Sequence, residues 1–273
     1  MMRNFNLTPV FKGMTMKEAW EGDFNLLAKR GMPEEQVMAL KAVVEDLKNR
    51  SVSEVFEFLA DTDPLFHAIY GYGKDDIFVY PFVAGKEIPE GIKEVEGKVG
   101  DQSSKWHWES LLEHACYVCA KLKEQGYFSE AEAILLAVWH DIGKKYTSAT
   151  NHVGGVCFYN HAAVSAFIAA KALVGSKLSV DTGKRLVAII FGHMQPLTLW
   201  NVDKDWQTGK PVDYKMKFFK EMLDFFDGDY AMAGKIVGDI DIFKECDLGI
   251  AKEDIDKPEI REAIARGREL ILG

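Results

Sequence analysis

The sequence predicts an all-α protein, built as a helical bundle with a mainly helical, partly irregular N-terminal region. Apolar residues recur every three or four positions through most of the chain, as in helices with one buried face. Helix-start signals, such as Ser129 followed by Glu132, precede several of these stretches. With 273 residues, 48% of them hydrophobic, the chain is long enough to bury a full core.

The first hundred residues are expected to form a helical region (1–100) whose role the sequence does not indicate. Helices are predicted over 16–29, 33–49 and 51–59 because apolar positions there have helical spacing. The aromatic and β-branched stretch 76–83 favours a short strand or an extended segment. Residues 84–104 are rich in Gly, Lys and Glu and show no periodicity, so they are the expected boundary or long loop.

The remainder of the chain (101–273) is expected to be one helical domain ending in a C-terminal helix. Gly126 and Gly143 can take the left-handed conformation that commonly ends helices. The segment 144–158 contains glycines and is predicted to be a loop. The predicted helices cover 109–125, 129–140, 160–174, 181–193, 214–234 and 258–272.

Charge and hydropathy exclude several classes of protein. The formal net charge of −9 argues against a sequence-independent grip on nucleic-acid backbone. The longest apolar runs, 133–139 and 186–191, are far shorter than the roughly 20 residues needed to span a bilayer. The N-terminus has no apolar signal-peptide core. We therefore expect a cytoplasmic protein with no membrane association and no strong nucleic-acid binding.

Histidine and aspartate recur in one half of the chain, in the order His114, His140-Asp141, His161 and His193. These are four of only seven histidines. Imidazole nitrogen and carboxylate oxygen together suit a divalent ion that also holds water or phosphate. A single histidine on an apolar helix is usually a satisfied core residue, but ligands at the ends of several helices are how bundles build metal sites. The series therefore predicts a metal centre.

The cysteines are not expected to form disulfides or to bind metal. The four in the chain do not form a disulfide framework for a protein of this size. Cys116 and Cys119 form a Cys-x-x-Cys on an apolar helix, with no second pair at zinc-ribbon spacing. They are interpreted as ordinary core residues.

Three local segments resemble the HD superfamily of metal-dependent phosphohydrolases, named for its His-Asp doublet. Residues 111–114 are similar to the superfamily's first-histidine helix, and 140–144 (His-Asp-Ile-Gly-Lys) match its most recognisable signature. Residues 158–166 resemble the segment after the doublet in HD domains attached to tRNA nucleotidyltransferases. The resemblance covers about 106–235 and implies an HD-domain helical bundle.

The resemblance also implies the metal ligands. Family members with only the first four ligands usually bind one ion, and those with two further histidines usually bind two. Two divalent ions are therefore expected here, with Mn, Fe, Mg, Co, Ni and Zn all reasonable. The implied ligands are His114, His140, Asp141, His161, His193 and Asp229.

The last carboxylate is the least defined of these ligands. Asp224, Asp227 and Asp229 crowd one short segment, and more than one register is arguable. Asp229 is preferred because residues 230–233 resemble the small-residue helix that follows the superfamily's last aspartate. The other two fit a solvated acidic turn at Gly228.

Further residues are candidates for contact with substrate. Asp141 could bridge two ions or orient the attacking water, and Lys144 could offset phosphate charge as a point cation. His152, in a glycine-containing loop, could bind phosphate or protonate the leaving oxygen, although solvated loop histidines are common. His107 could touch substrate at the pocket mouth, or it could simply pack beside its neighbouring tryptophans.

The function expected from the resemblance is hydrolysis of a phosphate mono- or diester by metal-activated water. The substrate would be a small phosphorylated molecule, such as a nucleotide. Two alternatives stay open: a di-iron oxygenase of the inositol oxygenase type, which uses the same ligand order, and a non-catalytic nucleotide or metal sensor. Lys144 and the 158–166 segment favour phosphate chemistry.

Overall fold

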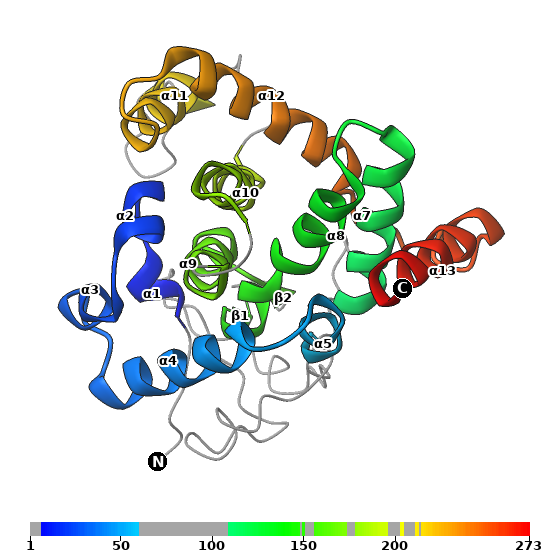
Figure 1. The fold of residues 1–273 in the computed structure, drawn as a ribbon, viewed down its shortest axis with the longest axis horizontal. Helices are drawn as coiled ribbons and strands as arrows, with labels where there is room; N and C mark the ends of the chain where they lie inside the picture. The colour runs from blue at the N-terminus through cyan, green and yellow to red at the C-terminus, as the bar shows by residue number, and fades with distance from the viewer. Residues whose placement is uncertain are drawn as a thin grey trace.

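Helices make up nearly all of the regular structure in the described part of the chain, which confirms the predicted all-α fold (Figure 1). The computed structural model describes residues 7–59, 109–147, 149–150, 156–173, 178–195, 203–204, 211–212 and 214–273. The predicted strand at 76–83 and the predicted boundary at 84–104 lie outside these residues. The strands within them are two-residue pairs: β1 (Ala149–Thr150) with β2 (Val156–Cys157), and β3 (Asp203–Lys204) with β4 (Pro211–Val212), both antiparallel.

The N-terminal helices follow the prediction with one correction. The single helix expected over 16–29 is two helices, because the chain breaks at Gly22 and Asp23. The Asp23 side chain accepts a hydrogen bond from the Leu26 amide and starts a new helix there. The helices are α1 (Thr8–Phe11), α2 (Met16–Glu21), α3 (Phe24–Lys29), α4 (Glu34–Lys48) and α5 (Val52–Phe58).

A second correction concerns the helix expected over 214–234. Asp227 and Gly228 both have positive φ angles, 52° and 85°, and form a turn that ends one helix and precedes another. The second helix then continues well past residue 234. The helices after residue 109 are α7 (Leu111–Gln125), α8 (Glu130–Trp139), the 3-10 helix η2 (Ile142–Tyr146), α9 (His161–Leu173), α10 (Val180–Gly192), α11 (Tyr214–Phe225), α12 (Tyr230–Cys246) and α13 (Pro258–Leu272).

Local capping explains where α7 begins and ends and where α8 begins. Ser110 and Glu113 form a reciprocal capping box at the start of α7, and Ser129 and Glu132 form another at the start of α8. Gly126 has a φ of 73° and ends α7 in the left-handed conformation, as predicted.

Helix α9 lies at the centre of the bundle, with α10, α2, α4, α8 and η2 packed around it (Figure 1). Its Phe167 side chain is fully buried and meets Phe11 and Phe24 edge-on, with ring centroids 5.5 and 5.6 Å apart. The helices on both sides of residue 100 therefore share one hydrophobic core. Among the described residues, no helix is long and apolar enough to cross a membrane.

Candidate metal centre

Six ligand-type side chains from separate parts of the chain meet inside the bundle. They form two sets of three, and within each set the ligand atoms all lie within 4.8 Å of one another. We call them the first group and the second group. None of the six side chains is more than 10% exposed. The first group is His114, His140 and Asp247, and the second is Asp141, His161 and His193.

Three of these ligands occupy the same position on different helices. His140, His193 and Asp247 are the C-cap residues of α8, α10 and α12. The C-terminus of a helix carries partial negative charge from its unpaired carbonyls, which favours a cation nearby. Three helix ends therefore add to the negative potential at this point.

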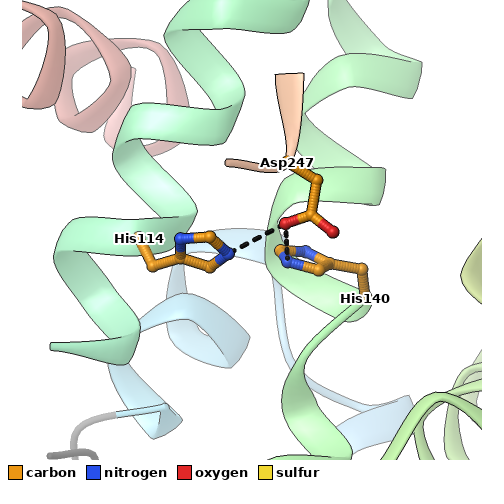
Figure 2. A group of neighbouring side chains, drawn as sticks. All are labelled: His114, His140 and Asp247. Carbon is orange, nitrogen blue, oxygen red and sulfur yellow. Dashed lines mark hydrogen bonds and ion pairs between the residues drawn. The ribbon is translucent and has the colours of Figure 1, made fainter. Parts of the chain in front are cut away.

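The first group is held together through a single carboxylate oxygen. Oδ1 of Asp247 lies 3.0 Å from Nε2 of His114 and 3.3 Å from Nε2 of His140. Figure 2 shows the Asp247 carboxylate reaching in from the end of α12 towards both rings, which come from α7 and the end of α8. Two imidazole nitrogens and one carboxylate oxygen are thus turned towards a common point.

Asp141 links the two groups. Its Oδ2 lies 3.3 Å from Nε2 of His140 and 3.4 Å from Nε2 of His114, both in the first group. Its Oδ1 lies 3.2 Å from Nε2 of His161 and 3.8 Å from Nε2 of His193, both in the second. One oxygen therefore faces each group, as a bridging carboxylate requires.

Main-chain carbonyls set the orientation of three of the four histidines. A carbonyl only accepts hydrogen bonds, so the Nδ1 atom that contacts it carries the hydrogen. The lone pair on Nε2 then faces the centre, which is the tautomer of a metal-bound histidine oriented by its other nitrogen. The contacts join Nδ1 of His140 to Leu136 O (3.1 Å) and Ala137 O (3.0 Å), Nδ1 of His161 to Phe158 O (2.7 Å), and Nδ1 of His193 to Ile190 O (2.6 Å).

This arrangement places lone pairs against one another. Nε2 of His161 and Nε2 of His193 are only 3.0 Å apart, so a proton or a cation must lie between them. Nε2 of His140 and both oxygens of Asp141 are buried and make no well-aligned hydrogen bond within the described part of the chain, although Lys144 forms an ion pair with one of these oxygens. Buried polar atoms left in this state are costly unless an ion satisfies them. The donor set therefore fits divalent cations.

The buried charged groups shift one another's pKa values. Burial opposes ionisation of Asp141, but Lys144 and His140 outweigh it and hold the pKa of that carboxyl well below its usual range. The pKa of Asp247 is lowered in the same way, chiefly by His140. Burial alone would lower the pKa of His140, but the two carboxylates raise it to about 10. Burial lowers the pKa of His193 to about 3. Both carboxylates are thus ionised, and in the metal-free protein Lys144 and the protonated His140 offset their charge.

The two lysines after the doublet point in different directions. Lys144 is buried, and its Nζ lies 2.6 Å from Oδ2 of Asp141 and 5.5 Å from the centre of the Phe158 ring. Lys145 instead donates to the Phe58 carbonyl and covers that residue's ring. Lys144 is therefore the lysine beside the candidate metal ligands.

Close packing fixes the turn that carries Asp141. The Gly143 amide donates to Oγ of Ser165 at 2.8 Å, which joins this turn to α9. A Cβ at position 143 would overlap the His161 carbonyl and approach the Ser165 amide nitrogen to 2.7 Å. Glycine at this position lets the segment carrying Asp141 lie directly against the start of α9.

The N-terminal segment forms hydrogen bonds with the end of η2 and with the residues just before α9. The Leu7 amide donates to the Tyr146 carbonyl at 2.8 Å, and Oγ1 of Thr8 donates to the Tyr159 carbonyl at 2.9 Å. The Asn160 side chain donates back to the Thr8 carbonyl at 3.1 Å and has a φ of 62°. Because α9 starts at the next residue, these bonds position His161 at the first turn of that helix, and no local sequence pattern indicates them.

The structure brings five of the six expected ligands together and places the sixth, Asp229, apart from them. Asp229 is exposed at the N-cap of α12, where its side chain accepts from the Met232 amide at 2.9 Å. Asp224 and Asp227 are exposed as well. The carboxylate at the centre is Asp247, at the opposite end of the same helix. That helix has 17 residues and is therefore about 25 Å long, so a residue at its start cannot reach a group at its end.

A signal for Asp247 was present in the sequence. Apolar spacing continues past the predicted helix end at residue 234, through Ile236, Ile240 and Phe243, which are all buried. Following that spacing would have placed an acidic residue at a helix end, like the His-Asp doublet. Predicted residues His107 and His152 lie outside the described residues.

The donor set contains nitrogen and oxygen but no sulfur. Cys116 and Cys119 are buried on α7 as free thiols, and burial raises the pKa of each to about 12, so neither supplies a thiolate at neutral pH. Histidine and carboxylate ligands suit borderline or hard divalent ions.

No family model, curated protein or solved structure matches the chain.

Proposed function

We propose that this protein is a metal-dependent hydrolase that cleaves a phosphate mono- or diester of a small substrate such as a nucleotide. The observation that carries the proposal is the position of Asp141, which faces one metal-ligand group with each oxygen while Lys144 stands beside it. An anionic substrate would meet a cationic side chain where the two groups converge. The resemblance of residues 140–144 to the HD signature supports the same chemistry.

Each group would hold one divalent ion, with Asp141 contributing one oxygen to each. Divalent ions in such sites bring the pKa of a bound water towards neutrality and offset charge on phosphoryl oxygens. In the structure Lys144 offsets the charge of Asp141. When cations take over that task, its ammonium would be available to a phosphoryl oxygen as a point charge. His152 is proposed as the proton donor to the leaving oxygen and His107 as a substrate contact.

Two other functions would use the same ligands. An oxygenase of the inositol oxygenase type would hold two irons, and a sensor would bind its ligand without turnover. The lysine beside the bridging carboxylate favours an anionic substrate, and the complete set of six ligand-type groups favours catalysis over sensing.

The test combines metal content with activity. Wild-type protein, purified with and without oxygen, is analysed for metals and assayed for phosphate release from a panel of mono- and diesters. We expect about two transition-metal ions per chain together with phosphate release, both lost when His140→Ala and Asp141→Ala are combined. Asp229→Ala, which changes an exposed carboxylate, is the control that keeps both. Two irons with oxygen uptake and no phosphate release would instead establish the oxygenase.

A further inference from the structure

We infer that Glu109 is a positioning residue that ties His114 to the segment carrying Asp247, and so controls cation binding by the first group alone. The inference rests on the metal sites of the proposed function. Glu109 immediately precedes the N-cap of α7 and was not singled out by any motif in the sequence.

The Glu109 carboxylate uses its two oxygens on two different segments. Oε1 lies 2.9 Å from Nδ1 of His114, and Oε2 accepts from the Ile250 amide at 3.0 Å. The Glu109 side chain is completely buried, and Ile250 is only 3% exposed. A carboxylate in such a place is costly unless its contacts repay its desolvation. These two contacts therefore stabilise the carboxylate in its buried position.

The first contact orients a metal ligand. The other three ligand histidines have Nδ1 fixed by main-chain carbonyls, which no substitution can remove. His114 differs because a side chain performs this task. A carboxylate oxygen 2.9 Å from Nδ1 favours a proton on that nitrogen, which leaves the lone pair of Nε2 directed at the group. Changing Glu109 therefore alters the orientation and basicity of one ligand histidine.

The second contact holds the other half of the same group. Asp247 ends α12, and Ile250 follows three residues later in the connection to α13. By accepting from the Ile250 amide, Glu109 fastens this connection beside His114. Both contacts thus act on the first group. The second group depends on other supports, the Gly143–Ser165 contact and the bonds of Thr8, so its ion should not respond to Glu109.

The test is Glu109→Gln in the full-length protein after metal removal. Glutamine keeps the size but offers one acceptor oxygen, so its NH₂ must face one of two N–H groups. Isothermal titration with Mn²⁺ or Zn²⁺ should show two binding steps in wild type. We expect the variant to weaken one step about 10–100-fold, the usual effect of losing a partner that orients a metal ligand, and to leave the other unchanged.

The matched control is Asp239→Asn. Asp239 is an equally buried carboxylate on α12, and it accepts from the Tyr127 hydroxyl at 2.6 Å and from Nε of Arg185 at 2.7 Å, outside both groups. The Asp239→Asn variant should have a lower thermal stability and keep both metal-binding steps as in wild type. If Glu109→Gln fails to fold, Glu109→Asp provides the same comparison, because the shorter carboxylate cannot reach both partners.

Each outcome is decisive. One weakened step in the Glu109 variant, with none in the control, supports the positioning role. Two unchanged steps, or two steps weakened equally, overturn it while leaving the metal sites in place. A wild type that binds neither ion overturns both proposals. A wild type that binds two ions but releases no phosphate overturns the hydrolase alone, and the Glu109 comparison still decides the positioning role.

Discussion

Asp247→Asn tests the assignment of the metal centre most directly, because Asp229 on the same helix provides an identical chemical change at an exposed site. Asp247 presents Oδ1 at 3.3 Å from Nε2 of His140. A unit positive charge at that distance is attracted by about 5 kcal/mol at an effective dielectric constant near 20. Part of this energy offsets the desolvation of the carboxylate. If about half remains, one ion should bind about 100-fold more weakly.

The assay is calorimetric titration of metal-depleted protein with Mn²⁺, together with thermal unfolding in the absence and presence of the ion. Asp247→Asn should weaken one binding step and lose most of the part of the metal-dependent rise in Tm that this one ion contributes. At 100 times the dissociation constant that rise reflects about 2.7 kcal/mol for one ion. Asp229→Asn should bind both ions as wild type does and unfold at nearly the same temperature, because asparagine caps a helix as well as aspartate does.

The reasoning would be refuted if Asp229→Asn weakened metal binding and Asp247→Asn did not. That result would mean that the ligand implied by the resemblance is correct and that the end of α12 does not contribute to the centre. Equal, unchanged affinities in the two variants would remove both carboxylates from the ligand set.

Three further predictions concern the same centre. Asp141→Asn should weaken both binding steps because its two oxygens face different groups, and elemental analysis that still finds one tightly held ion would contradict a bridging role. In the metal-free protein the pKa of His140 is raised from 6.5 to about 10, so the folded state keeps a proton that the unfolded state releases. The free energy of unfolding of the metal-free protein should therefore fall between about pH 6.5 and 10, and this dependence on pH should be weaker in His140→Gln. Chemical denaturation across this pH range measures the free energy of unfolding. If that of the metal-free wild type rose with pH instead, the result would argue against a charged imidazole. Thr8→Val removes the bond to the Tyr159 carbonyl and should cost about 1 kcal/mol, as seen in denaturant midpoints. In titrations it should weaken a binding step that Glu109→Gln leaves alone, and an effect on the same step would mean that the two groups are not supported separately.

Much of the secondary structure follows from short-range chemistry. The Ser129–Glu132 capping box and the left-handed Gly126 mark helix ends through contacts within a few residues, and the sequence was interpreted correctly at both. The break at Asp227 and Gly228 was missed because apolar spacing continues across it, although two positive φ angles separate α11 from α12. The type of each element was therefore predictable, but two helix breaks, at Gly22–Asp23 and at Asp227–Gly228, were not.

The sequence by itself determined the all-α class, because helix spacing and caps are properties of neighbouring residues, and the His-Asp series with its resemblance to the HD superfamily pointed to five of the six ligand-type residues. Only the tertiary structure decided that Asp247 takes the place expected for Asp229, and that Asp141 stands between two groups. The physical reason is that both facts depend on where helix ends meet in space. That meeting is set by packing around α9 and by long-range bonds such as that from Glu109 to the Ile250 amide, which no local pattern records.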